Sequence, residues 1–133
     1  MQAHVLVVDD DPDILETITL LLESSDYKVT TAQDGFEALE KLKTDKPDLM
    51  ILDLLMPRMD GFNVCKELQD TRWSRYRDMS IIILTSVREE ASRRRYELET
   101  GLQLDVDDYL EKPVKPEILI ERVEMYVNKK KKI

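Results

Sequence analysis

Apolar residues gather in short, almost unbroken runs along this chain, rather than alternating with polar residues. The strongest runs are residues 4–8, 49–52 and 81–84, and weaker ones are the β-branched 28–31 and the short 106–110. Unbroken apolar runs of this length are typical of strands that are buried on both faces of a parallel sheet. The pattern therefore predicts five strands, and the weak run 28–31 is expected at an edge of the sheet.

Segments in which apolar residues recur at helical spacing lie between these runs. Aspartates that can cap a helix, prolines in a first turn and a terminal glycine mark their limits. The predicted helices cover about 12–23, 35–46, 62–68, 89–100 and 116–127. Two further connections, residues 70–78 and 102–107, are long and irregular.

The regular alternation of strand and helix predicts an α/β fold. Five such units form a doubly wound parallel sheet with right-handed crossovers and helices on both faces. A chain of 133 residues is long enough for one sizeable core. We expect one domain over residues 1–128, followed by a basic tail or the start of a linker at residues 129–133.

Side chains that can handle a phosphoryl group follow four of the predicted strands. They are Asp9, Asp10, Asp53, Thr85 and Lys112. In open parallel sheets, ligands bind beyond the carboxyl ends of the strands, at the point where the strand order reverses. If the four strands are neighbours, three carboxylates, a hydroxyl and an ammonium group converge on one spot.

Four segments of the chain carry a resemblance to a known family. They are VLVVDDDPDIL at 5–15, DLMILDLLMPRMDGF at 48–62, IIILTS at 81–86 and DDYLEKPV at 107–114. Each is weak alone, but their combination in this order is highly specific. Over residues 3–127 the chain resembles the receiver domain of two-component response regulators. The resemblance implies a flavodoxin-like (βα)5 fold with strand order 2-1-3-4-5.

The resemblance assigns an acceptor and a metal site to the acidic residues. Asp53 would accept a phosphoryl group from the phosphohistidine of a partner kinase. A Mg²⁺ ion would be bound by Asp53 and Asp10 directly, by Asp9 largely through water, and by the backbone carbonyl of Leu55. Three like-charged carboxylates at about 5 Å repel each other by roughly 3–4 kcal/mol per pair, so a divalent cation is needed to offset them.

Three further residues take roles in catalysis and switching by the same resemblance. Thr85 would bond a phosphoryl oxygen and report its presence. Lys112 would pair first with the acceptor and then with the phosphoryl group, and its bond to Pro113 is expected to be cis. Tyr109 would change its exposure on activation, so that Thr85 and Tyr109 form a switch. The domain would catalyse only its own phosphorylation and dephosphorylation.

Composition limits the partners. The net charge is −8, and because the four lysines at 129–132 contribute four positive charges, the rest of the chain carries −12. Such a surface argues against direct binding of nucleic acid by this domain. No apolar run approaches the length of a membrane span, and no secretory signal opens the chain, so we expect a cytoplasmic location and no membrane partner.

The partners that the resemblance implies are proteins. A sensor histidine kinase or a phosphotransfer protein would supply the phosphoryl group, and an output domain or protein would respond to it. A homodimer on the last strand and helix is a further expectation. The connection GLQLDVDDY at 101–109 is longer than the family's usual turn, which affects the face where such contacts form.

Two alternative functions stay open on the sequence. One is a phosphohydrolase of the haloacid dehalogenase type, which also forms an aspartyl phosphate at a strand end. That family carries a second aspartate two residues after the nucleophile, where this chain has Leu55. The other is a binding module of receiver shape that is never phosphorylated. His4 and Cys65, the only histidine and the only cysteine, are expected to be structural.

Overall fold

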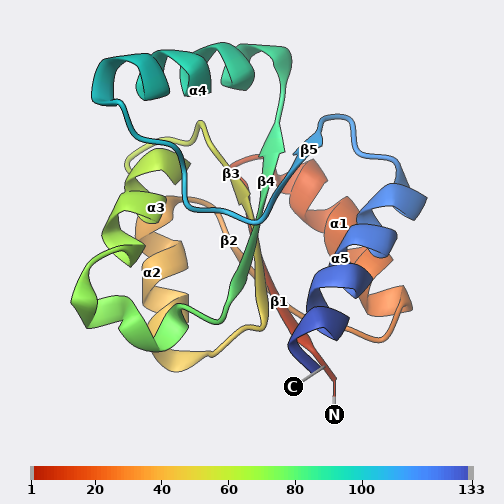
Figure 1. The fold of residues 1–133 in the computed structure, drawn as a ribbon. Coiled ribbons are helices and arrows are strands. Elements are labelled where there is room, and N and C mark those ends of the chain that lie inside the picture. Colours follow the sequence, from red (N-terminus) through yellow and green to blue (C-terminus); the bar gives the residue numbers. More distant parts are fainter. Residues whose placement is uncertain (1, 132–133) are drawn as a thin grey trace.

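A parallel five-stranded sheet lies between two layers of helices in the computed structural model, which describes residues 2–131 (Figure 1). The elements are β1 (His4–Val8), α1 (Pro12–Ser24), β2 (Lys28–Ala32), α2 (Gly35–Thr44), β3 (Leu49–Asp53), α3 (Gly61–Leu68), the 3-10 helix η1 (Thr71–Tyr76), β4 (Ser80–Thr85), α4 (Val87–Thr100), β5 (Asp108–Glu111) and α5 (Pro116–Lys131). The strand order is β2-β1-β3-β4-β5, and every neighbouring pair is parallel. The predicted doubly wound fold is confirmed, with β2 at an edge.

Polar caps at the carboxyl edge of the sheet set where the helices begin. Asp11, Asp34 and Asp60 each accept a hydrogen bond from a backbone N–H two or three residues further on, at 2.8–2.9 Å. Such caps satisfy donors that the first turn of a helix leaves without a partner. Because each cap lies shortly after a strand, the helices α1, α2 and α3 start close to the strand ends.

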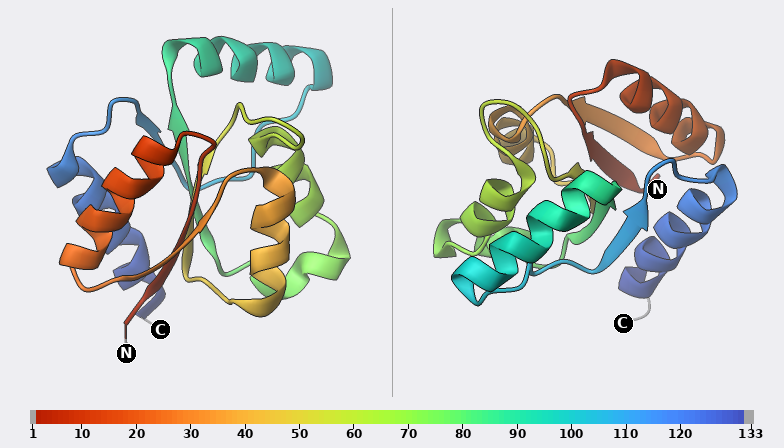
Figure 2. Two further views of the ribbon diagram at one scale, coloured as in Figure 1. Left: turned by 180° about the vertical axis from the view of Figure 1, so that it is seen from behind. Right: turned by 90° about the horizontal axis from the view of Figure 1, so that it is seen from above.

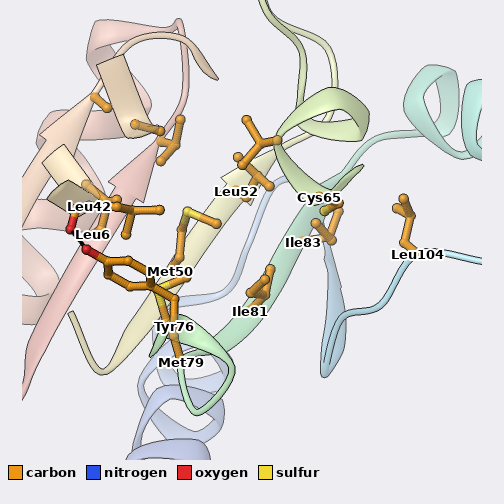
Figure 3. Packing of buried hydrophobic residues seen from close by; sticks show 14 of the residues in the cluster. Leu6, Leu42, Met50, Leu52, Cys65, Tyr76, Met79, Ile81, Ile83 and Leu104 are labelled. Carbon is orange, nitrogen blue, oxygen red and sulfur yellow. Dashed lines mark hydrogen bonds between the residues drawn. The ribbon is translucent and has the colours of Figure 1, made fainter. Parts of the chain in front are cut away.

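Two apolar clusters fill the space between the sheet and its helices. On one face, α1 and α5 pack against the strands, and on the other face α2 and α3 do so (Figures 1 and 2). In the cluster between the sheet and the helices α2 and α3, the Tyr76 hydroxyl donates to the backbone carbonyl of Leu42, and Cys65 lies near Ile83 (Figure 3). Burial raises the pKa of the Cys65 thiol to about 12, which fits a structural residue and not a reactive one.

Helix α4 and the connection after it differ most from the sequence prediction. The helix begins at Val87 rather than Glu89, because Ser86 caps it, and it lies across the carboxyl edge of the sheet (Figures 1 and 2). The connection 101–107 supplies Leu104 to the core cluster that also contains Ile81 and Ile83 of β4 (Figure 3). The last strand is therefore Asp108–Glu111, shifted from the predicted 106–110.

Smaller differences concern the ends of other elements. The connection 70–78, predicted as irregular, contains the helix η1. His4 is buried, and its Nε2 lies 2.6 Å from the Thr30 hydroxyl, as expected of a structural residue. Helix α5 includes 129–131 of the predicted basic tail, while residues 132–133 lie outside the described residues. Within the part of the chain that the structure describes, no helix has the length and apolar character needed to cross a bilayer.

Candidate functional site

Four of the predicted site residues meet at the carboxyl edge of the sheet. Asp9 and Asp10 follow β1, Asp53 ends the central strand β3, and Lys112 follows β5. One carboxylate oxygen from each of the three aspartates lies within 4.8 Å of the other two. The Lys112 Nζ atom lies 3.1 Å from Asp9 Oδ2 and 3.2 Å from Asp53 Oδ1. The bond between Lys112 and Pro113 is cis, as expected.

The acidic cluster is deeply buried on one side and open on the other. Asp9 is 1% exposed and Asp53 is 2% exposed, whereas Asp10 is exposed to solvent. Although both are close to Lys112, Asp9 Oδ2 and Asp53 Oδ1 have no hydrogen-bond partner among residues 2–131. Hard carboxylate oxygens with free lone pairs, next to the exposed carboxylate of Asp10, form a donor set that suits Mg²⁺.

Burial shapes the ionisation of this cluster. Desolvation, and then hydrogen bonding and repulsion from Glu89, raise the pKa of Asp53 to about 7. Desolvation also raises the pKa of Asp9 to about 6, with a further contribution from the charge of Asp53. Although burial lowers the pKa of Lys112, the two aspartates raise it to about 12, so this ammonium stays charged. The acidic groups Asp9, Asp10, Asp53 and Glu89 share this site with a single lysine, so Lys112 alone cannot neutralise the cluster when they are ionised.

The connection after Asp53 is fixed by the starts of two helices. The Gly61 N–H donates to the carbonyl of Leu54 at 2.8 Å, and a Cβ atom at Gly61 would lie 2.4 Å from the carbonyl oxygen of Asp53. Arg58, at a positive φ of 65°, pairs with the buried carboxylate of Asp34. Leu55 is half-buried in this connection, and the role of its carbonyl as a metal ligand stays a prediction.

The two predicted switch residues are joined through α4. The buried Thr85 hydroxyl, at the end of β4, donates to Glu90 Oε1 at 3.3 Å. The half-buried ring of Tyr109, on β5, lies under the guanidinium of Arg93, 4.6 Å from the ring centre to Cζ. Arg93 in turn pairs with Glu90 at 2.7 Å.

One residue of the site is missing from the sequence prediction. Glu89, in the first turn of α4, is 7% exposed, and its Oε1 accepts a hydrogen bond from Lys112 Nζ at 3.5 Å. The pattern Ser86-x-x-Glu89 is a capping box, which indicates a helix start but not a contact with Lys112. That contact depends on where α4 lies, and no local pattern indicates this.

Comparison with known proteins places the chain in a family. A family model described as response regulator receiver domain matches residues 5–124. The chain belongs to this family. Among curated proteins, it is 41% identical over 123 residues to the alkaline phosphatase synthesis transcriptional regulatory protein PhoP of Bacillus subtilis, covering 92% of this chain and 48% of PhoP. It is 38% identical over 131 residues to the response regulator MprA of Mycobacterium tuberculosis H37Rv, covering 98% of this chain and 53% of MprA.

Solved receiver structures share the whole fold. A putative response regulator from Chloroflexus aurantiacus matches with a TM-score of 0.79 and 30% identity, covering 96% of this chain and 99% of that one. The chemotaxis response regulator CheY4 of Vibrio cholerae matches with a TM-score of 0.79 and 30% identity, covering 95% and 99%. This receiver chain spans about half the length of the curated relatives it matches.

Proposed function

We propose that this receiver domain accepts a phosphoryl group on Asp53 from a phosphohistidine and thereby signals to an output domain or protein. The observation that carries the proposal is the position of Asp53, which is buried at the end of the central strand and shares the Lys112 ammonium with Asp9. A carboxylate in this position is a competent nucleophile towards phosphorus. Its Oδ1 has no hydrogen-bond partner in the described chain and so keeps a free lone pair.

The transfer exchanges one bond to phosphorus for another. A carboxylate oxygen of Asp53 forms a P–O bond while the P–N bond of the donor phosphohistidine breaks, which gives an acyl phosphate and a free imidazole. Phosphoryl transfer depends mainly on alignment and on neutralising charge. Lys112 supplies one fixed positive charge 3.2 Å from Asp53 Oδ1. Asp9, Asp10, Asp53 and the Leu55 carbonyl would hold Mg²⁺, which supplies the remaining charge neutralisation when bound.

The acyl phosphate then changes what Thr85 and Lys112 bind. Both would turn to phosphoryl oxygens, and Tyr109 would change its position as the Thr85 hydroxyl moves. Packed cores have discrete arrangements and not a continuous range of them, so such a change reshapes the neighbouring surface. We propose that a sensor histidine kinase or phosphotransfer protein is the donor, and that a homodimer through β5 and α5 is one form of the signalling state. The cytoplasmic location stays a prediction.

The residue at position 55 argues against a metabolic phosphatase. Leu55 stands where a haloacid-dehalogenase-type enzyme carries its second aspartate, which that enzyme family uses for turnover. The acidic body of the domain likewise supports a protein partner and not direct binding of nucleic acid. We therefore propose a signalling domain that is phosphorylated once and does not turn over phosphate esters.

Intact-mass spectrometry with a small phosphoryl donor tests this function. With acetyl phosphate and Mg²⁺, the domain is expected to gain one phosphoryl group, and a chelator is expected to prevent the gain. A mass that never changes would favour a receiver-shaped binding module. Continuous release of phosphate from p-nitrophenyl phosphate would favour the phosphohydrolase.

Binding of Mg²⁺ is expected to stabilise the fold. A ligand that binds only the native state raises stability by RT ln(1 + [L]/Kd), about 2.7 kcal/mol at one hundred times Kd. The melting temperature should therefore rise with Mg²⁺ in the wild type. Asp10→Asn removes the exposed ligand and should abolish most of this rise, while Asp26→Asn, which makes the same charge change in the turn before β2, should keep it. An equal rise in Asp10→Asn would remove this aspartate from the metal site.

Acid is expected to weaken Mg²⁺ binding. Asp53 and Asp9 have pKa values raised to about 7 and about 6, so protons compete with the metal as the pH falls through this range. We expect the affinity for Mg²⁺ to drop at least about tenfold between pH 8 and pH 5.5, since one raised pKa unit corresponds to a factor of about ten. In the absence of metal, pH affects the stability of the fold in the opposite direction. The raised pKa values of Asp53 and Asp9 stabilise the folded state at low pH, and this stabilisation is lost as the pH rises through 6–7. Calorimetric titration at both pH values measures the first effect, and an affinity that does not change with pH would contradict it.

A further inference from the structure

The first turn of α4 brings two adjacent glutamates to the two groups that a phosphoryl group on Asp53 needs. Glu89 Oε1 lies 3.5 Å from the Lys112 Nζ atom. Glu90 Oε1 lies 3.3 Å from the hydroxyl of Thr85. The ammonium and the hydroxyl that would bind phosphoryl oxygens are therefore both in contact with carboxylates of α4.

Helix capping alone does not explain why Glu89 is buried and in contact with Lys112. The Glu89 backbone N–H donates to Ser86 Oγ, and its Oε1 accepts from the same hydroxyl, both at 3.3 Å, so Ser86 caps the first turn. However, its Oε2 is buried and has no hydrogen-bond partner among the described residues. It is also the only buried residue of α4, all of whose side chains the structure describes. A cap needs neither the burial nor the contact with Lys112.

Glu90 connects Thr85 to Tyr109, the other residue of the predicted switch, through Arg93. Arg93 donates to both oxygens of Glu90, at 3.1 and 2.7 Å. Its guanidinium also lies over the Tyr109 ring, at 4.6 Å from the ring centre. Thr85, Glu90, Arg93 and Tyr109 thus form one continuous chain of contacts from the site to β5.

We propose that Glu89 and Glu90 form an internal lock, which holds Lys112 and Thr85 in the unphosphorylated domain and is expelled by the phosphoryl group. This inference rests on the proposed function of Asp53. A phosphoryl dianion beside the carboxylates of Asp9, Asp10 and Glu89 would face strong repulsion, because like charges in a partly buried site are poorly screened. Departure of Glu89 relieves part of that repulsion.

The two glutamates leave together because they are neighbours in one helical turn. The half-buried Tyr96 holds the later part of α4 by stacking on Phe62, with 4.9 Å between the ring centres. In the first turn, Glu89 is the only buried side chain, so no buried apolar side chain resists movement of that turn. When Glu90 leaves Thr85, it takes Arg93 away from the ring of Tyr109. Phosphorylation of Asp53 would in this way displace the start of α4 and free the ring of Tyr109 from Arg93.

Hydrogen exchange of the unphosphorylated domain tests the lock without any phosphorylation. The double variant Glu89→Gln/Glu90→Gln keeps the side-chain shape and the capping acceptors but removes both charges. Amides in the first two turns of α4 should exchange about tenfold faster than in the wild type, the change expected when hydrogen bonds to charged groups are weakened. Glu99→Gln, an exposed position on the same helix, is the matched control and should match the wild type. Equal exchange in the double variant and the wild type would overturn the lock.

Phosphorylation kinetics give the second, independent measurement. Because the incoming phosphoryl group must displace the two glutamates in the wild type, the double variant should be phosphorylated by acetyl phosphate about tenfold faster. Glu99→Gln should again match the wild type. A rate equal to or slower than that of the wild type would overturn the lock. If the wild type takes up no phosphoryl group at all, the proposed function fails, and the exchange experiment still decides whether the glutamates hold α4.

Discussion

Asp53→Asn is expected to abolish phosphoryl incorporation while leaving the fold intact. The amide that replaces the carboxylate has no oxygen able to attack phosphorus, so intact-mass spectrometry with acetyl phosphate and Mg²⁺ should show no added group. The variant should be at least as stable as the metal-free wild type, because burial and Glu89 disfavour the charged form of Asp53 and raise its pKa to about 7 in spite of Lys112. Urea unfolding measures this stability.

The matched control is Asp13→Asn, at an exposed position in the first turn of α1. This variant makes the same chemical change outside the acidic cluster and should take up one phosphoryl group like the wild type. Retention of a single phosphoryl group in Asp53→Asn would show that another residue is the acceptor. A large fall in its stability would instead show that the Asp53 carboxylate supports the fold.

Gly61→Ala is expected to have the largest effect on stability of any conservative change near the site. The added Cβ would lie 2.4 Å from the carbonyl oxygen of Asp53 and 2.9 Å from the Cα atom of Leu54. Both are backbone atoms that no side-chain rotation can move, so α3 or the end of β3 must shift. Overpacking of this kind lowers the free energy of unfolding by about 1–3 kcal/mol. Because the displaced atoms belong to the acceptor strand, phosphorylation should slow as well.

Gly101→Ala is the control for this substitution. Gly101 ends α4 at a positive φ of 70°, and a Cβ atom there would meet nothing within 4 Å. Its only expected cost is backbone strain of about 1 kcal/mol, with no effect on phosphorylation. Urea unfolding of both variants separates steric displacement from strain. If Gly61→Ala loses no more stability than Gly101→Ala and is phosphorylated normally, the close approach of α3 to Asp53 is unimportant.

The framework of the fold could be predicted because its signals are local. Unbroken apolar runs such as 49–52 indicate buried parallel strands, and caps such as Asp11 and Asp34 mark helix starts without reference to the rest of the chain. Once the strands are parallel, their carboxyl ends share one edge. The meeting of Asp53 with Asp9 and Lys112 then follows from topology, and the structure brings these side chains together.

The surroundings of α4 could not be predicted because its sequence carries no clear apolar stripe. Glu89 is the only residue of this helix that is buried, while Val87 and Leu98 are exposed, so periodicity does not show which side faces the sheet. The connection 101–107 contributes Leu104 to the core, and β5 begins only at Asp108. The contacts of Glu89 with Lys112 and of Glu90 with Thr85 depend on this long-range packing.

The central claim is that strand ends far apart in the sequence form one acidic site whose acceptor is Asp53. Borohydride reduces an acyl phosphate to an alcohol, so reduction of the phosphorylated domain marks the acceptor for peptide mass spectrometry. We predict homoserine at residue 53 alone, and only when Mg²⁺ accompanied the donor. A mark on Asp9, Asp10 or any other carboxylate, or labelling at Asp53 that is equally strong with a chelator present, would contradict the account.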